Sequence, residues 1–224
     1  MIPHIMDQPE LGKGEGPIAV ICAPTRELAH QIYVEAYKFT KSHNFRCVPV
    51  YGGASKGDQW KSLRQGVEVV IATPGRLIDM IKMKACAMDR VTYLVLDEAD
   101  KMFDMGFEPQ VRSIVGQIRP DRQVLLFSAT FKKNVERLAT EVLEDPVRIV
   151  VGNLGEANQD ITQVAMVMNE NEQKWSWLIS HVQEFVKQGS LLIFCSQKGM
   201  CEEIASRLKK QGFSGSSLFI PTFF

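Results

Sequence analysis

The chain has 224 residues, of which 45% are hydrophobic and 23% are charged, and its 26 basic side chains balance its 26 acidic ones. These proportions exclude a disordered or fibrous chain. A net charge of zero argues against a strongly basic nucleic-acid binder but leaves local phosphate sites open. The longest apolar stretches are far shorter than the roughly 20 residues that a membrane span needs, so we expect no transmembrane helix.

Short apolar runs alternate with amphipathic stretches along the chain. The runs predict strands over residues 18–22, 47–51, 67–72, 91–97, 124–128, 147–151, 163–168 and 191–195. Several are apolar at consecutive positions, which is typical of strands covered on both faces. Apolar residues at helical spacing predict helices over 135–143 and 175–186. This alternation favours an α/β fold in which a parallel sheet carries helices on both faces.

A polar segment, residues 152–162, joins two predicted strands without an intervening helix. Its pattern fits either a linker between domains or a long loop, and periodicity does not choose between them. A linker would divide the chain into a domain over residues 1–151 and a second unit over 163–224. About sixty residues hold too few strands for a stable α/β core, so we expect the second unit to be incomplete.

Five cysteines are present without any Cys-x-x-Cys pair, and two of them, Cys22 and Cys195, lie inside apolar runs. This usage indicates structural thiols in a reducing, intracellular compartment rather than disulfides. The four histidines are scattered along the chain, which argues against a zinc site.

Two adjacent carboxylates, Asp97 and Glu98, follow directly on the predicted strand 91–97. Ligands of open α/β sheets bind beyond the carboxyl ends of the strands. Acidic side chains at that place can hold Mg²⁺ and polarise a water, as nucleotide hydrolysis requires. The same residues also suit an ordinary helix start, because carboxylates are favourable near the positive end of the helix dipole.

Polar or glycine-containing turns follow four other predicted strands. They are Pro24–Ala29, Gly52-Gly53, Thr73–Arg76 and Ser128–Thr130. Backbone N–H groups at such turns can bind phosphate, and Arg26 and Arg76 can add charge-assisted bonds. Each turn alone is more typical of a helix cap. Four of them at one sheet edge with a carboxylate pair favour a binding site.

In this order and spacing, Asp97-Glu98-Ala99-Asp100 and the four turns resemble the DEAD-box RNA helicase family. Further matching stretches are Phe103–Ile114, Arg119–Gln123 and Leu191–Cys195. The resemblance covers roughly residues 1 to 212. Three short stretches resemble the branch associated with pre-mRNA splicing: Ile5–Gln8, Gly155–Asn158 and Lys174-Trp175.

The resemblance implies two RecA-like domains that close around ATP and single-stranded RNA. Asp97 would hold Mg²⁺, mainly through water, and Glu98 would act as general base. Asp100, Ser128 and Thr130 would couple the nucleotide state to the rest of the site. The implied RNA-backbone contacts are Pro24, Thr25, Arg26, Gly52, Gly53, Thr73, Pro74, Gly75 and Arg76. Such contacts bind RNA without reading its bases. The splicing-like branch favours the nucleus over the cytoplasm, with spliceosomal or other ribonucleoprotein partners.

The 224 residues also depart from the family pattern. They contain no G-x-x-x-x-G-K-[ST] phosphate-binding loop, no upstream glutamine motif, and neither arginine motif of the second domain. The resemblance implies that the strand beneath the phosphate-binding loop, in the middle of the first domain's sheet, is missing too. We therefore expect negligible ATPase activity from these residues alone. A catalytically inactive short product that acts as an RNA- or protein-binding regulatory module is the alternative.

Overall fold

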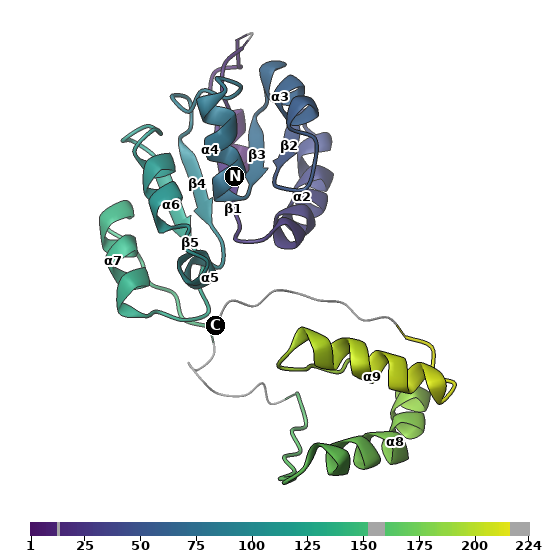
Figure 1. The fold of residues 1–224 in the computed structure, drawn as a ribbon. Coiled ribbons are helices and arrows are strands. Elements are labelled where there is room, and N and C mark those ends of the chain that lie inside the picture. Colours follow the sequence, from purple (N-terminus) through teal and green to yellow (C-terminus); the bar gives the residue numbers. More distant parts are fainter. Residues whose placement is uncertain (13, 152–159, 216–224) are drawn as a thin grey trace. The chain divides into compact units, whose positions relative to one another are not determined.

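The computed structural model describes residues 1–12, 14–151 and 160–215 of the chain (Figure 1). It divides into two compact units, with the boundary between residues 154 and 155. Most of the predicted linker, residues 152–159, lies outside the described residues.

The first unit is built on a parallel sheet of five strands. These are β1 (Ala19–Cys22), β2 (Cys47–Val50), β3 (Val69–Ala72), β4 (Tyr93–Leu96) and β5 (Gln123–Leu126). Their order is β2-β3-β1-β4-β5, and every pair is parallel (Figure 1). The first five predicted strands and the α/β class are confirmed. Cys22 pairs with Ala72 on one side and with Leu96 on the other, so the strands end level with one another.

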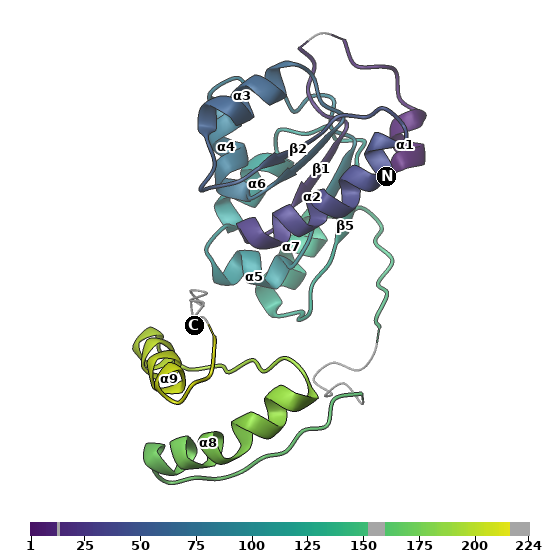
Figure 2. The same ribbon diagram turned by 90° about the vertical axis from the view of Figure 1, so that its right-hand side faces the viewer.

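Helices cover both faces of this sheet. One face carries α1 (Ile2–Met6) and α2 (Arg26–Lys41), and the other carries α3 (Lys56–Arg64), α4 (Pro74–Lys82), α5 (Ala99–Asp104), α6 (Glu108–Val115) and α7 (Lys133–Val142). Figure 2 looks onto the face crossed by α2. Within β1, Ala19 and Ile21 pack beneath α2, whereas Val20 and Cys22 pack into the larger cluster on the other side. Both faces are apolar because both are covered.

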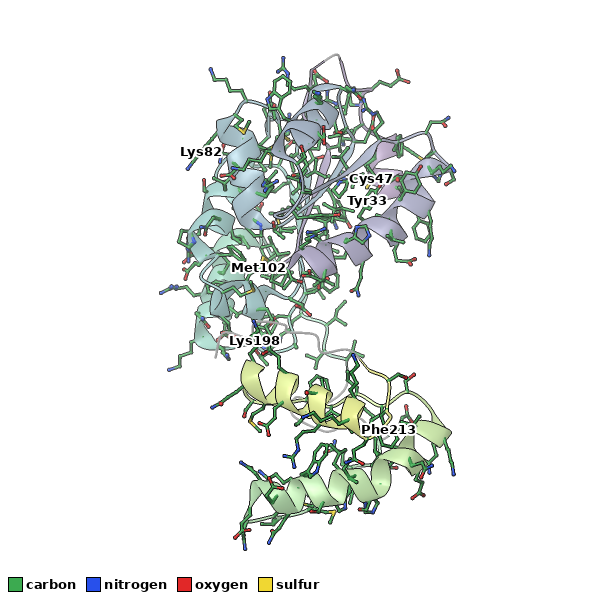
Figure 3. The ribbon with its side chains drawn as sticks, turned by 45° about the vertical axis from the view of Figure 1, so that its right-hand side comes forward. Tyr33, Cys47, Lys82, Met102, Lys198 and Phe213 are labelled. Carbon is green, nitrogen blue, oxygen red and sulfur yellow. The ribbon has the colours of Figure 1, made fainter. Side chains whose placement is uncertain are left out.

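Buried cysteine thiols belong to the core on both faces of the sheet. On the α2 side, Tyr33 lies next to Cys47 of β2 (Figure 3). Burial raises the pKa of the Cys47 thiol, and likewise that of Cys22 and Cys86, to about 12 in each case. All five cysteines are free thiols. These three therefore stay protonated and act as small apolar core residues.

The strands differ in how deeply they are covered. Every residue of β1 and β3 is buried, whereas β5 is only half-buried and Phe127, which follows it, is 52% exposed. The five strands pair without a gap, so the expectation of a missing strand in the middle of this sheet is wrong. A further parallel strand could therefore join this sheet only beside β2 or beside β5.

The second unit contains α8 (Asn171–Gln188) and α9 (Lys198–Lys210). Arg207 of α9 lies 4.1 Å from the ring centre of Trp175 and bonds to Glu172, 3.3 Å away, so the two helices are joined by one cation. Val182 of α8 is buried. Across the described ranges, no helix is long and apolar enough to cross a membrane. The predicted helices over 135–143 and 175–186 are confirmed as α7 and α8.

Three predicted strands, 147–151, 163–168 and 191–195, are wrong. These segments are extended but form no sheet, and Val167 and Phe194 are 97% and 86% exposed. Their runs of apolar residues are typical of a strand inside a sheet. A strand also needs a neighbour to take its backbone hydrogen bonds, and none of the described residues provides one for these segments. The pattern therefore marks residues suited to a sheet, although these segments form none.

Gly16 provides a test of the first unit's packing. A Cβ atom at this position would overlap the backbone carbonyl of Ala87, and backbone cannot move aside as a side chain can. We expect Gly16→Ala to lower the free energy of unfolding by about 2 kcal/mol or more. Urea unfolding followed by circular dichroism measures it.

Gly57 is the matched control, because its Cβ would meet only the Ser55 hydroxyl at 3.9 Å. Gly57→Ala should be neutral or slightly stabilising, since alanine favours a helix by up to about 1 kcal/mol. Equal stability of the two variants would contradict the close approach at Gly16.

Candidate functional site

The predicted catalytic carboxylates lie at the edge of the sheet where the strands end. The Asp97 N–H donates to the carbonyl of Cys22, 2.9 Å away, and so extends the pairing of β4 with β1 by one residue. The Asp97 side chain is half-buried, and its Oδ1 accepts the Glu98 N–H at 3.0 Å. The backbone thus fixes where Asp97 leaves the sheet.

Glu98 has a left-handed backbone, with φ 50° and ψ 52°, immediately before α5. This conformation is costly for a residue with a side chain and is concentrated at functional sites. Burial raises the pKa of the Glu98 carboxyl above its usual range, the negative charges of Asp97 and Asp100 raise it further, and Lys101 opposes them. A higher pKa makes this carboxylate a stronger base.

Asp100 joins the segment after β4 to the segment after β5. Its Oδ2 accepts the Thr130 hydroxyl at 2.8 Å and the Thr130 N–H at 3.0 Å. The Asp100 N–H donates to the Ser128 hydroxyl oxygen at 3.3 Å, and that hydroxyl donates to the Thr130 carbonyl at 2.7 Å. The structure therefore brings Asp100, Ser128 and Thr130 together in one closed hydrogen-bond network.

Burial raises the pKa of Asp100, but the hydrogen bonds that it accepts outweigh this effect. They come from the Thr130 hydroxyl and from the backbone amides of Lys101 and Thr130, and the pKa falls below its usual range. Asp100 is only 7% exposed, yet its carboxylate stays ionised because it accepts these hydrogen bonds. Asp100 is thus a fixed charge that holds two loops.

The predicted RNA-binding turns lie at the same edge. Thr25 caps α2, since its hydroxyl accepts the Leu28 N–H at 3.2 Å. Thr73 precedes α4 and Pro74 occupies the first turn, and the Thr73 N–H donates to the Val50 carbonyl at 3.0 Å. The Gly75 Cα lies near Phe107, which a Cβ would touch at 3.8 Å.

The turn at Gly52-Gly53 is held by three side chains. Arg26 donates to the Gly53 carbonyl at 3.2 Å, and Arg76 donates to the Ala54 carbonyl at 3.0 Å. Gln59 donates to the Tyr51 carbonyl at 3.0 Å. The turns after β1, β2 and β3 are therefore bonded to one another. Sequence reasoning missed Gln59 and Tyr51, because nothing in their spacing marks them.

Asp97 fits Mg²⁺ held mainly through water. Mg²⁺ keeps several waters and commonly takes one or two carboxylates together with substrate phosphates. Within the described ranges there is no group of three or more His, Cys, Asp or Glu side chains able to enclose a metal ion. A half-buried carboxylate at the strand end suits the water-mediated arrangement and not an all-protein cage.

The family model for DEAD/DEAH box helicases matches residues 1–138, a range that contains all fourteen predicted site residues. The chain belongs to the DEAD/DEAH box helicase family. It is 61% identical over 97% of its length to DEAD-box ATP-dependent RNA helicase 24 of Oryza sativa subsp. japonica. It is 55% identical over 95% of its length to ATP-dependent RNA helicase DDX42 of Homo sapiens.

A solved structure is also similar. The crystal structure of the yeast DEAD-box splicing factor Prp28 matches 92% of this chain with a TM-score of 0.64 and 32% identity. The chain spans 28% of the rice protein, 23% of the human protein and 49% of the Prp28 chain. The likeness to Prp28 confirms the RecA-like fold class.

The Asp100 network predicts a pH-dependent stability. A pKa that is lower in the folded state means that the unfolded state binds more protons as the pH falls, so the stabilisation is present above about pH 4 and is lost below it. We expect Asp100→Asn to lower the free energy of unfolding by about 1–3 kcal/mol at pH 7. The difference from the unsubstituted chain should shrink as urea titrations move below pH 4.

Asp89 serves as the control, since it is exposed. Asp89→Asn should change stability little at either pH. A gap between Asp100→Asn and the unsubstituted chain that stays constant from pH 7 to pH 3 would contradict the ionised network.

The backbone at Glu98 predicts an inverted order of stability. Alanine normally stabilises a chain relative to glycine, but here the left-handed conformation penalises alanine and not glycine. We expect Glu98→Gly to be more stable than Glu98→Ala by about 1 kcal/mol. Urea unfolding of the two variants measures this difference. The usual order, alanine above glycine, would show that Glu98 carries no such strain.

Proposed function

We propose that this chain is part of an ATP-dependent RNA helicase. In that enzyme it would bind the Mg²⁺ that accompanies the phosphates of ATP, and one stretch of RNA backbone. The proposal rests on one observation: the segments that follow the five strands lie at the same edge of the sheet. The carboxylates after β4 are bonded through Asp100 to the segment after β5, and the three turns after β1, β2 and β3 lie at the same ends of the strands. Family membership supports it.

In this proposal ATP supplies the phosphoryl group that is transferred to water. Asp97 holds Mg²⁺ through water from its place at the end of β4. Glu98 accepts the proton of the attacking water, and its raised pKa suits it to that task. The left-handed backbone of Glu98 directs this side chain away from the helix that follows and keeps it exposed.

Asp100 is the coupling residue of the proposal. Asp97, Glu98 and Asp100 lie within four residues, so a displacement of the carboxylates is passed to Ser128 and Thr130 through hydrogen bonds of 2.8–3.3 Å. A hydrogen-bond network that is centred on a buried carboxylate has few alternative arrangements. It therefore moves as a unit, which is what a nucleotide-dependent signal requires.

The turns after β1, β2 and β3 bind the sugar-phosphate backbone of RNA in this proposal. They offer backbone N–H groups and the exposed guanidinium of Arg26 to phosphate, and such contacts carry no base readout. Binding should therefore be insensitive to sequence and should weaken as salt rises.

We further propose a nuclear, ribonucleoprotein-associated role. Its support is the 32% identity to the yeast protein that is described as a splicing factor. Spliceosomal or other ribonucleoprotein particles are the partners that this likeness favours. Cell fractionation with an antibody against the first unit tests the location.

A chimera tests the catalytic proposal. In it, this chain replaces the matching 218 residues of the rice relative. We expect RNA-stimulated ATP hydrolysis from the chimera, and we expect Glu98→Gln to reduce kcat by about 10²–10⁴-fold, because a general base contributes that much. The 224 residues alone should hydrolyse no measurable ATP, since they lack the phosphate-binding loop.

The control variant is Glu10→Gln, the same substitution at an exposed position that is far from Glu98 in the sequence. It should leave kcat unchanged. An active chimera that keeps its activity with Glu98→Gln would refute the assigned base, and turnover by the 224 residues alone would refute the requirement for the missing loop.

A further inference from the structure

We infer that Gln59 is a positioning residue for RNA: its side chain holds the Gly52-Gly53 turn so that the N–H groups of the turn face outward to a phosphate. This inference rests on the proposed binding of RNA backbone at this edge. It assigns Arg76 to the same task, as a group that shapes the turn and does not itself contact phosphate.

Gln59 is a buried amide with both ends bonded. It is only 7% exposed, on the first turns of α3. Its Nε2 donates to the Tyr51 carbonyl at 3.0 Å, and its Oε1 accepts from Arg76 at 3.3 Å. One side chain therefore joins the end of β2 to the start of α4. A buried polar group bonded at both ends tolerates few other arrangements.

Arg76 is engaged in the same way. Its side chain is 12% exposed, and one nitrogen donates both to the Ala54 carbonyl at 3.0 Å and to Gln59. Its Nε lies 4.0 Å from Asp79, whose carboxylate is paired more closely with Lys56 at 2.7 Å. A guanidinium so covered has little surface left for a ligand.

Arg26 differs, because its side chain is exposed. It donates to the Gly53 carbonyl at 3.2 Å and lies over the Tyr51 ring at 5.5 Å from the ring centre. The Tyr51 hydroxyl is bonded to His30 at 2.9 Å. Arg26 can thus hold the turn and still present N–H groups to phosphate.

The carbonyls of residues 51, 53 and 54 all point to side-chain donors. In a turn whose carbonyls face the protein, the N–H groups face away from it. The N–H groups of Gly52 and Gly53 donate to no other group that the structure describes. Gly53 has φ +73°, and a Cβ there would collide with Arg26. Successive free N–H groups around a left-handed residue form an anion-binding concavity.

The plainer interpretation is that Gln59 is a satisfied core side chain whose loss would lower stability alone. Its partners argue for more. It bonds to the carbonyl directly before the two glycines and to an arginine of the neighbouring turn. Removing it would therefore free the turn to rotate its N–H groups, even in a chain that still folds.

Salt dependence separates the two roles. On single strands, each phosphate neutralised by an arginine contributes about 0.7 to the slope of log affinity against log salt, whereas a neutral N–H contributes nothing. We expect Gln59→Met to weaken binding of a fluorescent ten-nucleotide single-stranded RNA about tenfold with an unchanged slope. Arg76→Gln should behave likewise, and Arg26→Gln should reduce the slope by about 0.7.

Fluorescence anisotropy of the 224-residue chain measures both quantities, at temperatures where each variant is folded by circular dichroism. Gln117→Leu is the matched control: it removes an amide that bonds only within α6 and its end. It should leave RNA affinity unchanged. In spectra of glycine-labelled protein, the Gly52 and Gly53 N–H signals should shift with RNA, and Gln59→Met should reduce those shifts.

The outcomes are distinct. If the unsubstituted chain binds no RNA, the proposed function fails and this inference fails with it. If the chain binds RNA and Gln59→Met binds as tightly as Gln117→Leu, only the inference is overturned. If Gln59→Met does not fold, Arg76→Gln decides: a slope reduced as much as that of Arg26→Gln shows direct phosphate contact and overturns the inference.

Discussion

The parallel register of the sheet is the constraint on which the site depends. Cys22, Ala72 and Leu96 lie level across β1, β3 and β4, and Leu96 pairs with Leu126 of β5. Parallel strands must all emerge at the same edge, so segments that are more than 100 residues apart in the chain become neighbours there. Neither the carboxylates nor the turns after β1, β2 and β3 could meet without this alignment.

Two networks of different character grow from that edge. Around Asp100 the central group is a charge, which stays ionised although buried because hydroxyls and amides satisfy it. Around Gly52-Gly53 the central groups are carbonyls, which two cations and an amide satisfy. The first arrangement fixes a carboxylate and the second exposes N–H groups. Both follow the same rule, that a buried polar group must be bonded.

The sequence predicts the first unit well and the second poorly, for a physical reason. Runs such as 69–72 are apolar at every position. All five strands of the sheet that they imply lie within the first 130 residues. The runs 164–168 and 191–195 are equally apolar, but no described strand pairs with them, and Val167 stays exposed. Motif spacing predicted where Asp97 and Ser128 would lie. It carried no information on Gln59, whose importance comes from contacts and not from position.

Burial explains why two arginines of similar sequence setting differ. Arg26 and Arg76 each lie in the first turn of a helix that follows a strand, and both were expected to bind the RNA backbone. Arg26 lies at the exposed rim, where a guanidinium keeps donors for a ligand. The Arg76 side chain is only 12% exposed, and its donors are directed at a carbonyl and an amide. A site that binds a flexible polyanion needs both kinds of group, because an exposed charge attracts the phosphate while a fixed turn defines where it rests.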